Sequence, residues 1–411
     1  PPVGTFTSTA TSPVSGDFTV SLNFTPQEGF ADNILALEQS DIVISNATIE
    51  SFTLVTGSGG VTTGANIVVR PTGSGTVTLD LPANSVFDEA ENQNPAATQF
   101  SVTSDLTPPR LSAITRASPT GERTNSDTLS WIVTFSEPVE NVGAADFALT
   151  GSTAGLTVAI AAAGDQPDVS GIVPAAAPLP RSVSWQVTAS GGDLASVNAA
   201  VSLALAASPT INDEAGNALT DTSATGTVET FDVNNLAPLI ATIERDTPAT
   251  SATNEDSLTW RFTFAQIDNS FSLPANAFTV SGTTGTVTRV SRFSTGFDVT
   301  VSGGDLASLD GDVTIGLANT DFADDYGNVM DRTIPGGAEL TYTVDNTAPS
   351  GHAVAINPSP INAANQTAIG VDFTGFEAGG SLTYTVTSSG GAGSLSGGFA
   401  VPVADGSFPP Q

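Results

Sequence analysis

The chain has 411 residues, and its 42 acidic side chains outnumber 10 basic ones, all arginine, to give a formal net charge of −32. Nucleic acids and anionic membranes are bound through clusters of Lys and Arg, so this composition excludes both as partners. No apolar run approaches the roughly 18 residues that span a bilayer, so we expect no membrane insertion in this segment. The absence of cysteine excludes disulfides, thiolate metal sites and a cysteine nucleophile.

Strands are predicted where apolar residues alternate with polar ones, because successive side chains of a strand point to opposite faces. The pattern recurs with a period of about 105 residues, too long for a solenoid unit and typical of whole domains. The predicted strands, in chain order, are 18–24, 42–44, 76–81 and 99–103; 129–135, 147–149, 185–187, 201–205 and 230–233; 258–264, 278–280, 297–299, 313–317 and 341–344; and a weaker copy at 369–373.

Each complete repeat also contains a predicted hairpin turn before its last strand. The three turns are Asp88-Glu-Ala-Glu-Asn92, Asp213-Glu-Ala-Gly-Asn217 and Asp324-Asp-Tyr-Gly-Asn328. Asp, Gly and Asn suit such turns because they tolerate positive φ or bond their own backbone.

About seven short strands in each repeat predict an all-β chain of tandem Ig-like β-sandwich domains. The predicted domains are residues 1–104, 105–236, 237–346 and an incomplete fourth repeat at 347–411. The second repeat carries an insertion near 163–181, which the composition allows as a plain surface loop or as a binding loop. The chain starts Pro1-Pro2-Val3, as expected of an internal piece of a longer protein. Repeat 4 is therefore either truncated or completed by a strand from a partner.

The junctions between repeats are short and contain proline, at Pro108-Pro109, Pro238 and Pro349. Proline fixes φ and restricts the residue before it, so such junctions are stiff. We therefore expect an extended rod, on the order of 150 Å long for four sandwiches in line.

Catalysis has little support in the sequence, and we expect no enzyme. The single histidine, His352, lies in a predicted linker, so a Ser-His-Asp triad and multi-histidine metal sites are not available. Without lysine there is neither a P-loop nor a Schiff base. The tryptophans Trp131, Trp185 and Trp260 alternate with polar neighbours along their predicted strands. This pattern favours a place in the core over a sugar-stacking platform.

Calcium is the metal that the acidic side chains suit, because Ca²⁺ takes six to eight oxygen ligands. Acidic and amide side chains are expected to gather where the end of one repeat meets the hairpin of the next. The candidate ligands are Asp105, Asp213, Asn217, Asp324, Asp325 and Asp345. The alternative is that Asp and Asn are present at these turns for backbone geometry alone.

Several motifs resemble the tandem bacterial Ig-like repeats of very large cell-surface proteins, such as adhesins and gliding-motility filaments. They are Phe135-Ser-Glu-Pro-Val139, Ala145-Asp-Phe-Ala-Leu-Thr-Gly151, Ser190-Gly-Gly-Asp193, Asp213-Glu-Ala-Gly-Asn217 and Asp345-Asn-Thr-Ala-Pro349. The likeness covers essentially the whole chain and adds weight to calcium at the junctions. Repeat 3 departs from it, with Ala265-Gln266-Ile267 in place of Ser136-Glu137-Pro138 and Ala277 in place of Asp146, so a role needing both Glu137 and Asp146 is confined to repeat 2.

The resemblance implies a structural or adhesive extracellular region of a bacterial surface protein that acts as a spacer or filament. Its expected partners are other repeats of the same protein and an unidentified surface or glycan ligand. Two alternatives stay open: a self-assembling filament or surface-layer subunit that exchanges strands at repeat 4, and a carbohydrate-binding accessory region of a secreted enzyme.

Overall fold

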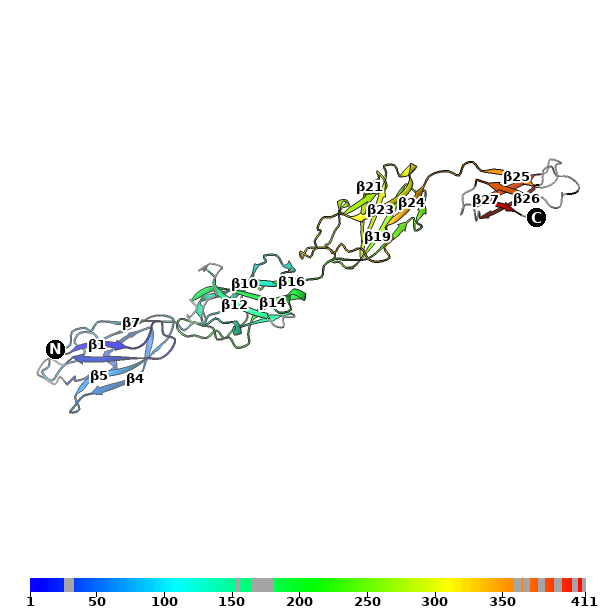
Figure 1. Ribbon diagram of the computed structural model, residues 1–411. Helices are drawn as coiled ribbons and strands as arrows, with labels where there is room; N and C mark the ends of the chain where they lie inside the picture. Colours follow the sequence, from blue (N-terminus) through cyan, green and yellow to red (C-terminus); the bar gives the residue numbers. More distant parts are fainter. Residues whose placement is uncertain are drawn as a thin grey trace. The chain divides into compact units, whose positions relative to one another are not determined.

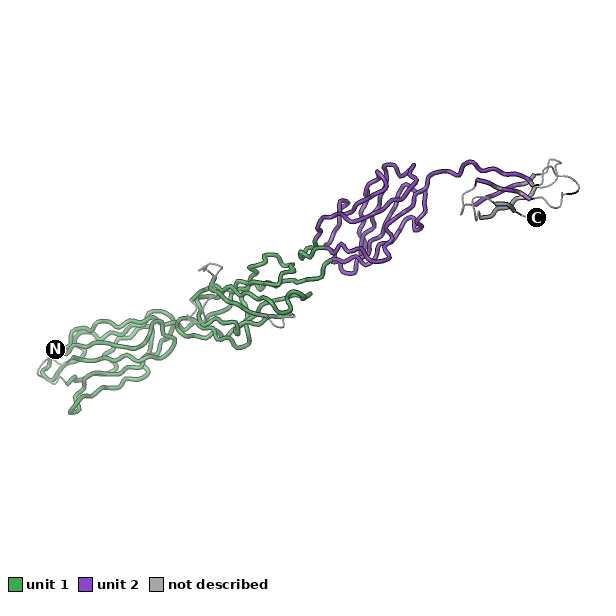
Figure 2. The backbone as a smooth tube through the Cα atoms, in the orientation of Figure 1, with its two compact units in different colours: residues 1–237, 323–329 green, residues 238–322, 330–411 purple. Residues whose placement is uncertain are grey.

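The computed structural model describes residues 1–25, 33–151, 156–163, 181–357, 364, 370–375, 381–387, 394–400 and 406–408. Residues 164–180 of the predicted insertion near 163–181 lie outside the described residues. The chain divides into two compact units (Figure 2), one made of Pro1–Ala237 with Ala323–Val329 and the other of Pro238–Phe322 with Met330–Gln411. A short piece of the third repeat, Ala323–Val329, thus belongs to the first unit.

Repeat 1 is a two-layer β-sandwich in the first unit (Figure 1). Its sheets have the strand orders β1-β2-β5-β4 and β3-β6-β7, with antiparallel pairing throughout both. Lettered A to G in chain order, these are the ABED and CFG sheets of a constant-type Ig domain. The strands are β1 (Val3–Ser8), β2 (Phe18–Thr25), β3 (Val43–Ser45), β4 (Ala47–Thr56), β5 (Thr62–Pro71), β6 (Gly75–Asp80) and β7 (Phe100–Ser104).

Repeat 2 repeats this strand order. One sheet runs β12-β13-β10 with both β8 and β15 paired to β10, and the other runs β11-β14-β16-β9. The short β9 pairs with β16 in parallel. The strands are β8 (Leu111–Ser118), β9 (Arg123–Thr124), β10 (Thr128–Glu140), β11 (Phe147–Thr150), β12 (Leu156–Ala162), β13 (Ser182–Gly191), β14 (Asn198–Leu205), β15 (Asn212–Asp213) and β16 (Thr230–Asn234).

Repeat 3, in the second unit, has the sheets β17-β19-β22-β21 and β18-β24-β23-β20. Its strands are β17 (Leu239–Thr247), β18 (Ala252–Thr253), β19 (Ser257–Gln266), β20 (Phe278–Ser281), β21 (Thr286–Phe293), β22 (Gly296–Ser302), β23 (Asp310–Leu317) and β24 (Thr341–Asp345). The described part of repeat 4 has the sheets β25-β26-β29 and β27-β28. Its strands are β25 (Ala353–Asn357), β26 (Gly370–Thr374), β27 (Ser381–Thr387), β28 (Ser394–Ala400) and β29 (Gly406–Phe408).

Each of the first three repeats has its own hydrophobic core, as the alternating patterns require. The three tryptophans are fully buried, as the sequence predicted: Trp131 and Trp185 in repeat 2, and Trp260 in repeat 3. Trp131 meets Phe231 edge to face at 5.1 Å, and Trp260 meets Tyr342 in the same way at 4.8 Å. Such pairs contribute about 0.5–1.5 kcal/mol beyond the burial of their area, and here they join the two sheets of one sandwich.

The helical segments are single 3₁₀ turns. They are η1 (Gln39–Asp41), η2 (Ala144–Asp146), η3 (Leu194–Ser196), η4 (Ala275–Ala277) and η5 (Leu306–Ser308). Within the described ranges, none of the helices has the length and apolar character needed to cross a membrane. The chain is therefore all-β, a series of tandem Ig-like sandwiches.

Candidate metal centre and docking hairpins

The three predicted Asp-to-Asn hairpins share one internal hydrogen-bond pattern, and we call them the hook hairpins: Asp88–Asn92, Asp213–Asn217 and Asp324–Asn328. In each, the Asp N–H donates to the Asn carbonyl at 3.1 Å. The Asn N–H donates to Asp Oδ1, and Asn Nδ2 donates to Asp Oδ2, at 2.8–3.0 Å. The buried Asp carboxylate therefore fixes the orientation of the Asn amide.

Two of the hook hairpins use this amide to bind the end of the preceding repeat. Asn217 Nδ2 also donates to the backbone carbonyl of Asp105 at 2.9 Å, just after β7. Asn328 Nδ2 donates to the carbonyl of Asn234 at 2.8 Å, at the end of β16. Both contacts lie within the first unit, because Ala323–Val329 belongs to it. These two hook hairpins thus attach to the end of the last strand of the repeat before them.

The hook hairpin Asp324–Asn328 makes further contacts with repeat 2. Asp325 forms an ion pair with Arg123 at 3.1 Å, and the guanidinium of Arg123 lies 5.5 Å from the ring centre of Tyr326. The Tyr326 hydroxyl donates to Asp232 Oδ2 at 2.6 Å, and Asn125 Nδ2 donates to the side-chain oxygen of Asn328 at 3.2 Å. Asp325 is thus held by a cationic partner within the protein.

A cluster of three carboxylates lies where repeats 1 and 2 meet. One carboxylate oxygen from each of Asp105, Glu137 and Asp213 lies within 4.8 Å of the other two. Asp105 is positioned by hydrogen bonds from the Ser74 hydroxyl and the Thr107 N–H to its Oδ1. Asp213 is positioned by β15, which pairs with the end of β10 beyond Glu137.

The cluster is electrostatically unfavourable as it stands. Burial, and then the negative charges of Asp105 and Asp213, raise the pKa of Glu137 above its ordinary value. In the described part of the chain, none of the three carboxylates takes part in an ion pair with arginine. Three hard oxygen donors at one point fit Ca²⁺, which takes carboxylate, carbonyl and water ligands. The donor set therefore fits the ion, with waters and carbonyls needed to complete its shell.

The structure distributes the six predicted metal ligands unevenly. Asp105 and Asp213 lie together, and Asn217 is beside them as a hydrogen-bond donor. Asp324 and Asp325 lie in another hook hairpin, as described above. Asp345 ends β24, where its Oδ1 accepts the N–H of Thr347 at 3.0 Å.

Glu137 completes the cluster and was not among the predicted ligands. Glu137 and Asp146 belong to neighbouring motifs of repeat 2, but Asp146 is buried elsewhere. Its carboxylate accepts the N–H groups of Gly143 and Thr210, at 2.7 and 2.6 Å. The motif that contains Glu137 was a signal for the repeat type, and it did not specify which carboxylates converge.

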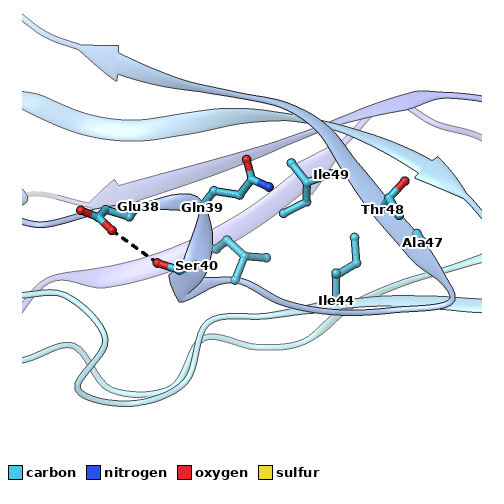
Figure 3. Close-up of a pocket in the computed structure, with 8 residues that line it drawn as sticks. Glu38, Gln39, Ser40, Ile44, Ala47, Thr48 and Ile49 are labelled. Atoms are coloured by element: carbon cyan, nitrogen blue, oxygen red, sulfur yellow. Dashed lines mark hydrogen bonds between the residues drawn. The ribbon is translucent and has the colours of Figure 1, made fainter.

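Repeat 1 also has an open pocket of 670 Å³ beside η1 and the start of β4. Figure 3 shows its lining, with the side chains of Ile44 and Ile49 beside Glu38, Gln39 and Ser40. The Ser40 hydroxyl donates to Glu38 Oε2 at 3.4 Å. The lining of the pocket combines apolar and polar side chains.

Comparison with known proteins finds no matching family model and no match among curated sequences. Among solved structures, the match to invasin, a bacterial integrin-binding protein, covers 97% of this chain and 79% of the invasin chain, at 12% identity and a TM-score of 0.31. The match to the native conformation of Escherichia coli alpha-2-macroglobulin covers 98% of this chain and 28% of that protein's chain, at 8% identity and a TM-score of 0.16. Both similarities are distant, and the Ig-like assignment rests on the strand order given above.

Proposed function

We propose that this chain is a structural or adhesive extracellular region of a large bacterial surface protein, and that its Ig-like repeats serve as a spacer. The observation that carries the proposal is the bond from Asn217 to the Asp105 carbonyl, which joins one repeat to the end of the one before it. A binding module that acts alone has no need of such a contact. The motifs that resemble bacterial surface repeats support the same function and a place at the cell surface.

The short junctions support a spacer as well. Residues 105–110 separate β7 from β8, and residues 235–238 separate β16 from β17. With Pro108, Pro109 and Pro238 among them, these segments have few accessible backbone conformations. A spacer requires this stiffness, because a loose linker would let neighbouring repeats fold back on one another.

Pulling the chain from its two ends in a single-molecule force experiment tests the spacer proposal. Independent repeats of about 105 residues should unfold one at a time, and each event should release about 350 Å of chain. A single event that releases the whole chain, or extension without resolved events, would contradict a series of load-bearing domains.

We further propose that Asp105, Glu137 and Asp213 bind Ca²⁺ and so brace the contact between repeats 1 and 2. The support is the three carboxylates within 4.8 Å of one another without a basic partner in the described residues. When bound, the ion would supply positive charge. The protein would supply three oxygen ligands, while Asn217 holds Asp213 and the Asp105 backbone in place. Titration calorimetry with millimolar Ca²⁺ tests this, and the absence of heat would rule it out.

A further inference from the structure

The three hook hairpins are alike inside, but they differ in what their Asn amide binds. In Asp213–Asn217 and Asp324–Asn328, the amide bonds a backbone carbonyl of the preceding repeat. In Asp88–Asn92, the amide of Asn92 bonds the two oxygens of Asp88, at 3.2 and 2.9 Å, and no other group among the described residues. Asn92 is exposed, whereas Asn217 is half-buried and Asn328 is buried.

Strand register aligns the starts of the three repeats. Gly4 pairs with Phe24, Leu111 with Phe135 and Ile240 with Phe264, and these three Phe residues are equivalent in the repeat. Counting back two residues from the first member of each pair places Pro2, Pro109 and Pro238 at one equivalent position.

The carbonyl that the hook binds has a fixed place relative to this proline. Asp105 lies four positions before Pro109, and Asn234 lies four positions before Pro238. The acceptor is a backbone group, so the contact accepts either Asp or Asn at that position. For repeat 1, the equivalent acceptor is the residue four positions ahead of Pro2 in a chain that continues in that direction.

We propose that the hook hairpin Asp88–Asn92 is a docking site for the carboxyl end of the last strand of another Ig-like repeat, joined ahead of Pro1. Asn92 Nδ2 donates to the backbone carbonyl of that strand end, as Asn217 and Asn328 do within this chain. The partner is therefore a repeat of the same kind, recognised through its main chain, and neither a small ligand nor a nucleic acid.

Glu91 takes the place of the glycine found in the other two hook hairpins, where the space for a β-carbon can be compared. A Cβ at Gly216 would lie 3.9 Å from the Ser15 hydroxyl oxygen of the preceding repeat. One at Gly327 would lie 3.2 Å from the side chain of Asn125, which would have to shift by a few tenths of an ångström. A β-carbon at this position is thus compatible with a neighbouring repeat at Gly216 and needs a small adjustment at Gly327.

The test extends the full chain by a second copy of residues 1–107 placed ahead of Pro1. This reproduces the natural Thr107-Pro108-Pro109 junction, because the added Thr then precedes Pro1-Pro2. The added copy carries Glu89→Asp, so that its peptide covering 86–94 differs in mass from that of the original repeat 1. Amide hydrogen exchange of the original peptide is compared in the extended and the unextended chain, in chelator so that no cation contributes. Asn92→Ala is the test variant, and Gln93→Ala, an exposed neighbour, is its matched control.

We expect exchange in this hairpin to slow by about tenfold in the extended chain, and to stay slow in Gln93→Ala but not in Asn92→Ala. The comparison of the two unsubstituted chains needs no variant, so it holds even if Asn92→Ala weakens repeat 1. Equal exchange in both chains would overturn the proposal. So would protection that appears in the unextended chain as its concentration rises, because that result assigns the site to a second copy in trans.

Discussion

Replacing Glu137 by Gln should stabilise the protein in chelator and destabilise it in calcium, relative to the unchanged chain. The substitution keeps the shape of the side chain and removes its charge. Glu137 is half-buried beside Asp105 and Asp213, and its carboxylate makes no hydrogen bond within the described residues. Its charge therefore acts through repulsion when no cation is bound.

The size of this repulsion follows from the geometry. Two unit charges 4.8 Å apart, the limit for these oxygens, repel by about 1 kcal/mol in water and about 3.5 kcal/mol at an effective dielectric constant of 20. Glu137 faces two such charges but is half-buried, so solvent screens much of the effect. We expect Glu137→Gln to raise the free energy of unfolding by about 1–2 kcal/mol at neutral pH in chelator.

The pH dependence has a defined sign. The pKa of Glu137 is raised in the folded state, mainly by burial and then by Asp105 and Asp213. Below the pKa that Glu137 has in the unfolded state, the folded and the unfolded chain both carry the proton, so no charge on Glu137 destabilises the folded state. As pH rises from there through the folded pKa, the unfolded state loses its proton first, so the folded state loses stability. The advantage of Glu137→Gln should grow over this range and stay constant above it.

Calcium should reverse the order of stability. An ion that binds only the folded state stabilises it by RT ln(1 + [L]/Kd), about 2 kcal/mol at fifty times Kd. Thermal unfolding in millimolar Ca²⁺, in Mg²⁺ and in chelator measures this, with Glu255→Gln as the control for the loss of one exposed charge. The account is refuted if Glu137→Gln is less stable than the unchanged chain in chelator, or if Ca²⁺ raises both melting temperatures equally.

Three further predictions concern single side chains. Asn217→Ala should lower the free energy of unfolding by about 1–3 kcal/mol in chemical denaturation, because the Asp105 carbonyl loses its donor; an effect no larger than that of Asn92→Ala would argue against the hook. Glu91→Gly should raise the free energy of unfolding by about 1 kcal/mol, and with it the melting temperature, because Glu91 has a φ of 60°, which glycine adopts without strain. An unchanged or lower melting temperature would count against strain at this position. Burial raises the pKa of Tyr342 to about 12, so its stability contribution is present below pH 10 and lost as pH rises through 12. Absorbance titration should show a late tyrosine step that Tyr342→Phe removes, and its persistence in that variant would assign it elsewhere.

Most central strands could be predicted because their burial follows sequence alternation, although the central strand β5 of repeat 1 was missed. In β2 and β19, every second residue is buried and carries a large apolar side chain. The edge strand β4 was missed, and its register explains why. Pairing with β5 shifts between Ile49 and Ser51, which breaks the two-residue period by which a strand is predicted.

The hook hairpins were predicted as turns from their Asp, Gly and Asn residues, and the repeat pattern also predicted that Asp213 and Asn217 meet the junction at Asp105, where the structure has them. The bond from the Asn217 amide to a backbone carbonyl was not predicted, because a side-chain pattern does not specify which main-chain group 112 residues away accepts it. Glu137 was missed as a cluster member. Its position beside Asp213 depends on the pairing of β15 with β10, next to the point where the register of β10 with β13 shifts, between Thr134 and Val139.

Small-angle X-ray scattering of the full chain tests the spacer account most directly. A compact protein of this length has a radius of gyration of about 22 Å. Four sandwiches in line, on the order of 150 Å in total, give about 43 Å. The account predicts a value near 40 Å or above and a scattering profile typical of an elongated particle. A value near 22 Å would mean that the repeats fold back on one another, and it would contradict a spacer.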